Sequence, residues 1–212
     1  IDHPEVQAYL KQVFDRVLQD WGFDLVKLDF LYGAAPFGNA RESRAGRMQR
    51  AMALLRSWCG DKLILGCGVP VMPAFGIVDY CRIGCDVGLD WDDVWYMRFF
   101  HRERVSTKQS IGNTIFRRQL NGRAYGSDVF FLREENCKLT LQQKQTLARV
   151  NALFSGILLT SDMPSRYTDE MRRQYNALRE LTDHAENCTV DADDGLTVHY
   201  TLHGKQQAIK VF

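Results

Sequence analysis

Polar or reactive side chains interrupt three apolar stretches of the sequence, each near the end of a predicted strand. LVKLDF carries Lys27 and Asp29, LILGCG carries Cys67, and CRIGCDV carries Arg82 and Asp86. Strands of parallel α/β sheets are almost continuously apolar because helices cover both faces. In barrel enzymes the carboxyl ends of the strands face the active site. These five residues are therefore the first candidates for chemistry.

Asp29 and Asp86 have the side chain that glycoside hydrolysis uses in pairs. One carboxyl group acts as acid and base, and the other attacks the sugar as a nucleophile. Two carboxylates could instead form half of a magnesium site, because Mg²⁺ prefers oxygen ligands. Residue types and spacing favour a barrel enzyme that uses two carboxylates, but they do not exclude the other possibilities.

Each candidate also has a structural alternative. Lys27 with Asp29 could form a buried ion pair, although such pairs seldom stabilise a fold. Cys67 could be a small core residue. Arg82 with Asp86 could form a surface salt bridge of little energetic consequence. The spacing alone leaves these alternatives open.

Helical and strand patterns alternate along the chain and must position these residues. Apolar residues at three- and four-residue steps predict helices at 4–22, 44–60, 140–154 and 168–185. Short apolar runs predict strands at 23–30, 62–68, 80–86, 123–133 and 156–162. The first helix is predicted to bury a stripe of Val6, Leu10, Val13, Val17 and Trp21. A capping box of Thr140 and Gln143 is predicted to open the third.

This order predicts the α/β class, because alternating strands and helices form parallel βαβ units. About five strands fit part of a (β/α)8 TIM barrel, predicted over residues 1–187, better than a complete one. Past Asn187 the pattern changes to period two, which predicts the start of a carboxyl-terminal antiparallel β-sandwich domain at 188–212. A doubly wound open sheet is the competing topology. No GxGxxG or GxxxxGKS motif follows a strand, which weighs against nucleotide binding.

Composition excludes several classes of function. The net charge is +1, so neither a nucleic-acid nor a membrane-surface partner is expected. We expect no leader peptide, and the longest apolar stretch is too short and too broken to span a bilayer. Six scattered cysteines indicate reduced thiols and a cytoplasmic protein. Without a CxxC or HExxH motif, we expect no metal site and no cofactor.

Three segments together resemble a known family of enzymes. They are WGFDLVKLDFLYGA, LILGCGVPVMPAFGIVDYCRIGCDVGLDW and SGILLTSDMPSRY. In this order they resemble the alpha-galactosidases of glycoside hydrolase family 36, whose core pattern is shared with family 27. The resemblance covers roughly the first 170 to 190 residues. It implies a retaining hydrolase that removes terminal alpha-galactosyl residues from oligosaccharides by double displacement.

The resemblance also implies roles for the five candidates. The aspartate of the K-x-D strand, Asp29, is implied to be the nucleophile, and Lys27 to contact sugar hydroxyls. Asp86 is implied to be the acid/base, and Arg82 a substrate-binding residue. Cys67 is implied to lie near the 2-position of the sugar. The two carboxyl groups would then be about 5–5.5 Å apart, as in retaining glycosidases.

Aromatic residues at the mouth of the predicted site complete this interpretation. Tyr32, Trp91 and Trp95 are candidates for stacking on a sugar ring, although each type of residue more often serves packing. Two other functions stay open. One is a related exo-glycosidase, such as an alpha-N-acetylgalactosaminidase, and the other is a non-catalytic sugar-binding or assembly module.

The resemblance departs from the family at the amino terminus. The chain begins at what resembles the helix before the fourth barrel strand, and the first three strands have no counterpart. The acidic pair and the tryptophan that hold the galactose 4- and 6-hydroxyls in the family are therefore missing. We expect the chain to be a fragment, whose partner is the missing amino-terminal half or a second copy in a homo-oligomer.

Overall fold

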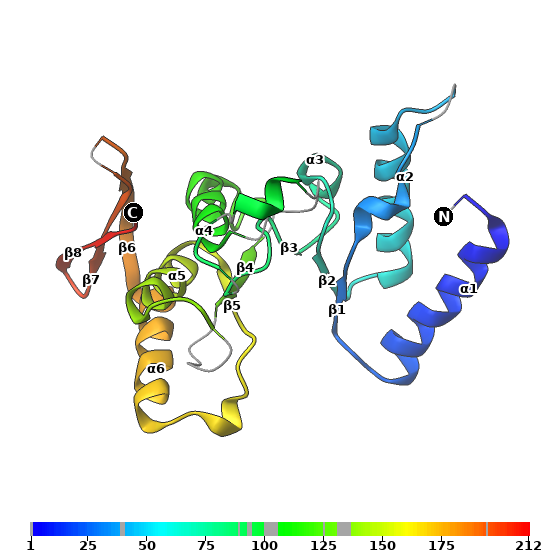
Figure 1. Ribbon diagram of the computed structural model, residues 1–212. Coiled ribbons are helices and arrows are strands. Elements are labelled where there is room, and N and C mark those ends of the chain that lie inside the picture. The colour runs from blue at the N-terminus through cyan, green and yellow to red at the C-terminus, as the bar shows by residue number, and fades with distance from the viewer. Residues whose placement is uncertain are drawn as a thin grey trace. The chain divides into compact units, whose positions relative to one another are not determined.

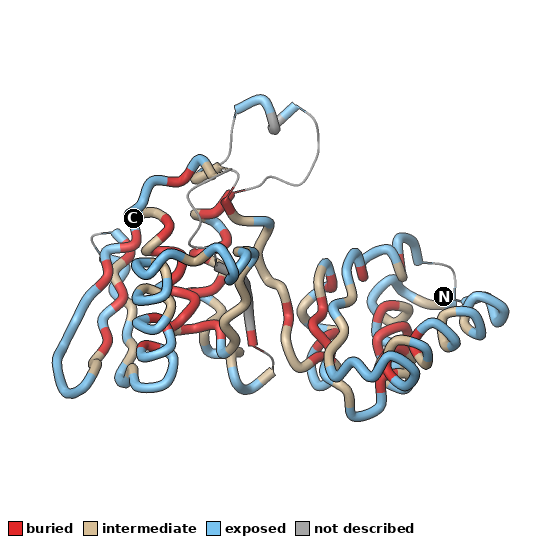
Figure 2. Tube along the Cα trace, turned by 90° about the horizontal axis from the view of Figure 1, so that it is seen from below, coloured by how far each residue is buried: buried red, intermediate tan, exposed pale blue. Residues whose placement is uncertain are grey.

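The computed structural model describes residues 2–38, 41–88, 90–92, 95–99, 106–124, 126–130, 137–193 and 195–212. The chain divides into two compact units. The first unit contains residues 1–83 and 123–126, and the second contains residues 84–122 and 127–212. Buried positions, shown in red in Figure 2, occur in both units, so each unit has a core of its own.

The first unit is built on a parallel sheet of three strands in the order β1-β2-β3 (Figure 1). Its elements are α1 (Pro4–Asp15), a π-helical turn (Arg16–Asp20), β1 (Leu25–Leu28), a 3₁₀ turn (Leu31–Ala34), α2 (Arg44–Cys59), β2 (Leu63–Gly66), α3 (Val71–Ala74) and β3 (Tyr80–Cys81). The parallel pairing of β1 with β2 through α2 confirms the predicted βαβ arrangement. β3 is shorter than predicted, with two residues in place of seven.

Helix α1 buries a different stripe from the predicted one. Phe14 and Leu18 are buried, whereas Val6, Val13 and Trp21 are exposed. The Phe14 ring lies 5.5 Å from the ring of Trp58 on α2, measured between centroids. Two apolar rows lie next to each other on this helix, and its last turn is π-helical, which shifts the phase of the side chains. The spacing of apolar residues does not show which of the two rows is buried, because burial depends on the element that packs against the helix.

Arg56 of α2 holds together the segments that lead into β2 and β3. Its guanidinium donates to the carbonyl oxygens of Lys62 at 2.7 Å and of Ile77 at 2.7 Å, and to Asp79 Oδ2 at 2.7 Å. The same Oδ2 atom accepts a hydrogen bond from the backbone N–H of Ile64 at 2.8 Å. Arg56 therefore fixes the starts of two strands whose ends carry candidate site residues.

Replacing Arg56 with alanine is expected to lower the free energy of unfolding of the first unit by about 1–3 kcal/mol, because Asp79 and two carbonyl groups lose a charged donor. Arg50→Ala is the matched control. Arg50 lies on the same helix but pairs with Asp2 and Glu42 at the surface, where solvent screens the charges, so a clearly smaller loss is expected. Hydrogen exchange at the Ile64 amide, combined with urea unfolding, measures both effects. Equal losses of unfolding free energy in the two variants would show that Arg56 does not hold the starts of β2 and β3 in place.

The second unit combines helices with two separate sheets (Figure 1). Its elements are a 3₁₀ turn (Trp95–Phe99), α4 (Thr107–Phe116), a 3₁₀ turn (Arg118–Leu120), β4 (Ser127–Phe130), α5 (Leu141–Phe154), β5 (Gly156–Thr160), a 3₁₀ turn (Pro164–Arg166), α6 (Asp169–His184), β6 (Ala185–Asp191), β7 (Thr197–Leu202) and β8 (Lys205–Lys210). β4 and β5 are parallel, joined through α5. The predicted strand at 123–133 extends past β4 into residues outside the described part of the chain.

Two sequence signals are confirmed in this unit. Thr140 and Gln143 form the predicted capping box at the start of α5. The period-two pattern forms an antiparallel sheet in the order β6-β7-β8. The inward residues Val198 and Tyr200 belong to the same buried cluster as Leu147 of α5, so this sheet shares a core with the helices. The predicted domain boundary after residue 187 stays a prediction.

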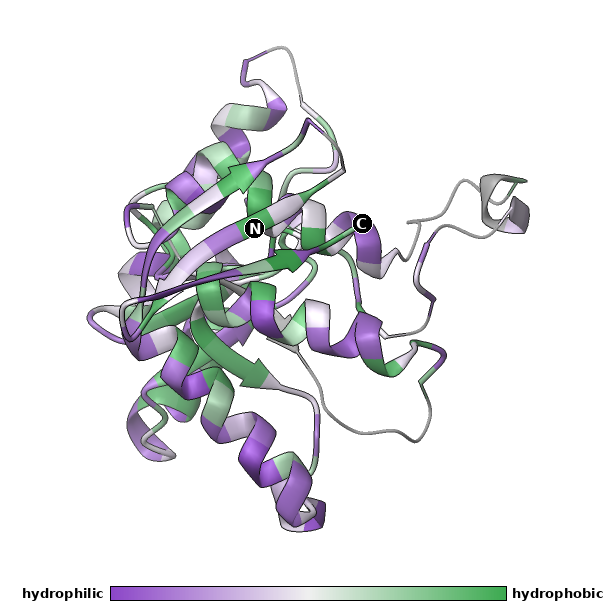
Figure 3. Cartoon of the chain, turned by 90° about the vertical axis from the view of Figure 1, so that its left-hand side faces the viewer, coloured by the Kyte–Doolittle hydropathy of each residue, from purple (hydrophilic) through white to green (hydrophobic). Residues whose placement is uncertain are grey.

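The helices have the mixed surfaces that a globular protein requires. In Figure 3 hydrophobic and hydrophilic residues alternate along them, as in amphipathic helices that cover a core. Among the helices that the structure describes, none combines the length and the apolar character needed to cross a membrane.

Candidate active site

Strand register brings three of the predicted residues to the same edge of the sheet in the first unit. The last paired residues of the three strands lie side by side in register: Leu28, Gly66 and Cys81. Asp29, Cys67 and Arg82 each follow one of these residues directly. The backbone N–H of Cys67 donates to the carbonyl of Leu28 at 2.9 Å, and that of Arg82 to the carbonyl of Gly66 at 2.8 Å. The three side chains therefore start from adjacent positions at the carboxyl ends of parallel strands.

Lys27 and Asp29 form an ion pair at this edge, and the pair is not buried. Lys27 Nζ lies 3.3 Å from Asp29 Oδ2, and the two side chains are 46% and 43% exposed. The other carboxylate oxygen, Oδ1, accepts a hydrogen bond from the backbone N–H of Phe30 at 2.8 Å. The strand ends at Leu28, so these groups lie where the sheet meets solvent and need not be dry.

The contacts of Asp29 favour the ionised form of its carboxyl group. A hydrogen bond from the Cys67 thiol lowers the pKa of its carboxyl group most, followed by the Phe30 N–H and by Lys27. Burial raises the pKa of Cys67 to about 11, and the hydrogen bond to Asp29 adds to this effect. The positive charge of Arg82 acts in the opposite direction on the thiol. At neutral pH the row of strand-end residues Asp29, Cys67 and Arg82 therefore holds a carboxylate beside a protonated thiol.

Cys67→Ala is expected to raise the pKa of Asp29 toward its ordinary value, because the largest stabilising contact of the carboxylate disappears. Since this pKa lies below its ordinary value, Asp29 stays ionised into acidic solution, and the variant should begin to protonate at a higher pH. Carbon-13 NMR titration of the labelled carboxyl group measures the change. Cys188→Ala removes another partly buried thiol, in the second unit, and should leave the Asp29 titration unchanged. An unchanged titration in Cys67→Ala would contradict the assignment.

The spacing of polar residues in the sequence does not indicate Phe30, whose backbone supplies a donor to Asp29. Phe30 adopts a left-handed conformation with φ of 53°, which is uncommon for a residue other than glycine. Its ring is exposed and lies 6.0 Å from the ring of Tyr32 in an edge-to-face arrangement. Gly68 also has a positive φ, and a Cβ atom there would lie 3.1 Å from Tyr32. An aromatic residue directly after an apolar strand was the only signal available, and it carries no information about φ.

The predicted substrate residue Tyr32 lies in the same unit as Asp29. Its backbone N–H donates to the carbonyl of Gly68 at 2.7 Å, which ties the turn after β1 to the turn after β2. The exposed rings of Phe30 and Tyr32 therefore belong to the turn after Asp29, and this turn is tied to the one after Cys67. A contact of Tyr32 with a sugar stays a prediction.

Asp86 belongs to the second unit, where hydrogen bonds hold the segment around it to the start of α4. Ser106 N–H donates to Cys85 Sγ at 3.2 Å, and the thiol donates to the Ser106 carbonyl at 3.1 Å. Gly88 N–H donates to Thr107 Oγ1 at 3.0 Å. Ser106 and Thr107 are fully buried, whereas Asp86 is exposed between the two anchor points. This segment therefore presents a carboxyl group on a fixed backbone, and the acid/base role stays a prediction.

The two predicted tryptophans differ in their surroundings. Trp91 is partly buried and packs against the core of the second unit, so part of its surface serves packing. Trp95 is 73% exposed, and its ring lies 6.1 Å from Tyr96 and 6.0 Å from Phe99. Within the described part of the chain, no three His, Cys, Asp or Glu side chains are grouped closely enough to hold a metal ion.

Parallel strands joined by helices, with polar side chains just past their carboxyl ends, are the arrangement found in TIM barrels and related α/β folds. No model of a known protein family matches this sequence. Solved structures narrow this choice of folds. The chain is similar to an alpha-galactosidase from Thermus thermophilus in complex with p-nitrophenyl alpha-D-galactopyranoside, with a TM-score of 0.72 and 25% identity over 96% of this chain and 40% of that chain.

Two further structures support the same fold. One is the Thermus thermophilus enzyme in complex with stachyose, with a TM-score of 0.65 and 27% identity over 82% of this chain and 38% of that chain. The other is a family 27 β-L-arabinopyranosidase from Geobacillus stearothermophilus, with a TM-score of 0.64 and 13% identity over 94% of this chain and 48% of that chain. The chain thus has the fold of part of an enzyme from the clan of glycoside hydrolases that contains the alpha-galactosidases. It spans about two fifths of the Thermus enzyme.

Proposed function

We propose that the chain is the carboxyl-terminal part of the catalytic barrel of a family 36-type retaining alpha-galactosidase, which hydrolyses terminal alpha-galactosyl residues of oligosaccharides. The observation that carries this proposal is the row formed by Asp29, Cys67 and Arg82 at the carboxyl ends of three registered parallel strands. In this row Asp29 is held ionised by specific donors, as a nucleophile requires. The similarity to alpha-galactosidase structures supports the choice of sugar.

In the proposed mechanism, a carboxylate oxygen of Asp29 attacks the anomeric carbon and forms a covalent glycosyl ester. The bond to the leaving oxygen breaks, and Asp86 donates its proton to that oxygen. In the second step Asp86 removes a proton from water, which attacks the anomeric carbon and releases Asp29. Two inversions give net retention at the anomeric carbon.

The remaining residues bind and orient the sugar in this proposal. Lys27 donates to a sugar hydroxyl while its charge keeps Asp29 ionised, and Arg82 contacts the substrate from the neighbouring strand end. Cys67 lies beside Asp29 and faces the 2-position. Tyr32 and Trp91 contact the sugar ring through their aromatic surfaces. No cofactor or metal takes part in this mechanism.

We also propose that the active protein requires a partner that continues the sheet, namely an amino-terminal barrel half. β1 is an edge strand of the described sheet. An open groove of about 370 Å³ runs beside it, lined mainly by apolar residues of α1, the π-helical turn and β1 with the residues before it, among them Val13, Val17, Phe23 and Val26. Unpaired strand edges and apolar grooves are surfaces that another βα unit would cover.

Turnover of p-nitrophenyl alpha-D-galactopyranoside tests the proposal. The chain is assayed alone and joined to the amino-terminal barrel half of the Thermus thermophilus alpha-galactosidase. Aryl alpha-N-acetylgalactosaminide and aryl β-L-arabinopyranoside serve as competing substrates. Turnover restored by the added half, with preference for the galactoside, supports the proposal. A joined protein that folds but hydrolyses none of the three substrates would support the non-catalytic module.

A further inference from the structure

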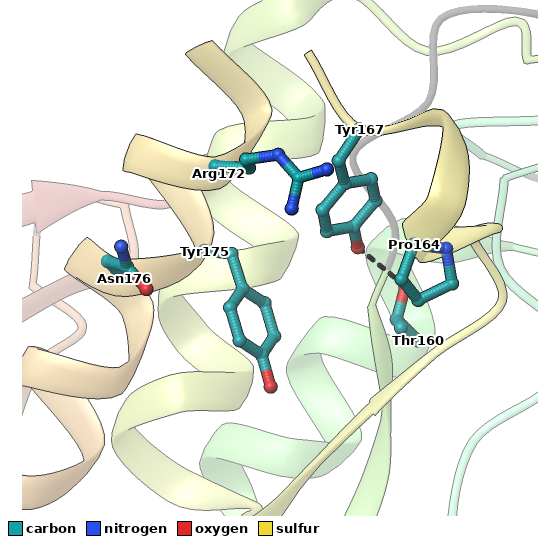
Figure 4. A pocket seen from close by; sticks show the side chains of 6 residues that line it. All are labelled: Thr160, Pro164, Tyr167, Arg172, Tyr175 and Asn176. Carbon is teal, nitrogen blue, oxygen red and sulfur yellow. Dashed lines mark hydrogen bonds between the residues drawn. The ribbon is translucent and has the colours of Figure 1, made fainter. Parts of the chain in front are cut away.

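A second group of residues that could bind a ligand lies in the second unit, and it includes none of the residues to which a catalytic role is assigned. It lines an open pocket of about 330 Å³. The lining residues come from α6, from the end of β5 and from the turn between them: Thr160, Pro164, Tyr167, Arg172, Tyr175 and Asn176 (Figure 4). This volume is at the lower end of the range of about 300–1,000 Å³ for pockets that bind small molecules.

The Tyr167 side chain forms a fixed wall of this pocket. Its hydroxyl group donates to Asp162 Oδ2 at 3.0 Å and lies 3.5 Å from Thr160 Oγ1, the contact drawn in Figure 4. Thr160 Oγ1 also accepts a hydrogen bond from the Asp162 N–H at 3.1 Å. These contacts hold the ring in place, so its apolar surface is available to a ligand without loss of side-chain freedom.

Tyr175 provides a second aromatic surface, at an angle to the first. The centroids of the Tyr167 and Tyr175 rings are 6.3 Å apart, and the ring planes are inclined by 54°. The apolar ring of Pro164 contributes to the same lining. This concave apolar surface suits the C–H faces of a non-planar ring better than a flat aromatic ligand, which would need parallel walls.

Two polar side chains complete the pocket. Arg172 and Asn176 are both on the exposed side of α6, where their groups can donate to a ligand. Among the residues that the structure describes, no carboxylate forms an ion pair with Arg172. The next residue, Arg173, is instead paired with Glu170 at 2.6 Å. One cation and one amide suit hydroxyl groups on a neutral ring, whereas a phosphate dianion would require more positive charge.

We propose that this pocket binds a pyranose ring of a saccharide, as an accessory site that uses none of the proposed catalytic residues. The ring lies against Tyr167, Pro164 and Tyr175 through its C–H groups. Its hydroxyl groups accept hydrogen bonds from Arg172. They also donate to the amide oxygen of Asn176 and accept from its amide nitrogen. Such a site would hold an oligosaccharide whether or not the chain catalyses hydrolysis.

Titration of the complete chain with methyl alpha-D-galactopyranoside, followed by amide NMR shifts, tests the inference. Saturable shifts are expected at residues 160–176. Arg172→Ala should weaken binding about tenfold or more, because charged hydrogen bonds to the ligand are lost. Arg173→Ala is the matched control and should bind as the unmodified chain does. Arg172 is exposed, so its replacement should not unfold the protein, and Tyr175→Phe tests the hydroxyl group with the aromatic surface retained.

Several outcomes would overturn the inference. These are no shifts at residues 160–176, equal shifts with cyclohexanol at the same concentration, or undiminished binding in Arg172→Ala. Shifts confined to residues 27–32 and abolished by Asp29→Asn would also overturn it, but would leave the proposed catalytic function intact. Conversely, binding at residues 160–176 by a protein that turns over no galactoside would support the inference while the proposed function fails.

Discussion

Asp29→Gly is expected to abolish turnover of p-nitrophenyl alpha-D-galactopyranoside by the active form of the protein, with a loss on the order of 10⁴- to 10⁶-fold, the range that removal of a catalytic group causes in other enzymes. The physical reason is that no other carboxylate takes the position of Asp29 in the described row. Glycine leaves space for a small anion without adding a competing hydrogen-bonding group.

The matched control for this variant is Asp24→Gly. Asp24 precedes the same strand, and its side chain is largely exposed and paired with Lys62. The same replacement there tests whether glycine near β1 damages the fold. Activity close to that of the unmodified protein is expected for Asp24→Gly. Retained activity in Asp29→Gly would show that Asp29 is not the nucleophile.

Azide should partly restore activity to Asp29→Gly, and the stereochemistry of the product identifies the role. Azide that replaces the nucleophile attacks the face opposite the leaving group, so an alpha-galactoside should give β-galactosyl azide. Proton NMR of the anomeric centre distinguishes this product from its alpha anomer. Formation of alpha-galactosyl azide by this variant would contradict the assignment of Asp29 as the nucleophile.

Asp86→Ala is expected to reduce hydrolysis by about 10²- to 10⁴-fold, the usual contribution of general acid–base catalysis. The loss should depend on the leaving group. Alkyl galactosides need protonation of the departing oxygen and should lose most, whereas dinitrophenyl galactosides, whose leaving group is stable as an anion, should lose least. The rate constants of both substrates with the variant and the unmodified protein provide the measurement.

Azide also tests the role of Asp86, because azide can replace water in the second step of the reaction. In Asp86→Ala the covalent intermediate on Asp29 still forms, and azide would attack it to give alpha-galactosyl azide with net retention. Asp183→Ala, an exposed position on α6, is the matched control in the same unit. An equal loss for alkyl and dinitrophenyl substrates in Asp86→Ala would exclude the acid/base role.

Several elements of the fold were predictable from local sequence because their signals are strong and short in range. Helix α2 occupies the predicted segment and ends at Cys59, followed by the capping residue Gly60, whose positive φ favours glycine. The capping box at Thr140 depends only on residues three apart. Strands β1 and β2 were visible as apolar runs bounded by polar residues. Such signals do not depend on the rest of the chain.

The partners of these elements were not predictable in the same way. Which row of α1 is buried depends on Trp58, which is remote in sequence from Phe14. The short β3 strand forms because it pairs with β2. The segment that leads into β3 is held by the contact between Arg56 and Asp79. Long-range contacts of this kind leave no local pattern, because almost any apolar or charged partner would satisfy them.

For the candidate site, the sequence by itself determined which residues could act: Lys27, Asp29, Cys67, Arg82 and Asp86 stand out because they interrupt apolar stretches. The tertiary structure decided what three of them form together. Parallel register places Asp29, Cys67 and Arg82 one residue beyond a common row, and the left-handed backbone of Phe30 aims an N–H group at the carboxylate. Residue type limits the chemistry that a side chain can perform, but only the pairing of distant strands sets which groups meet and in what ionisation state.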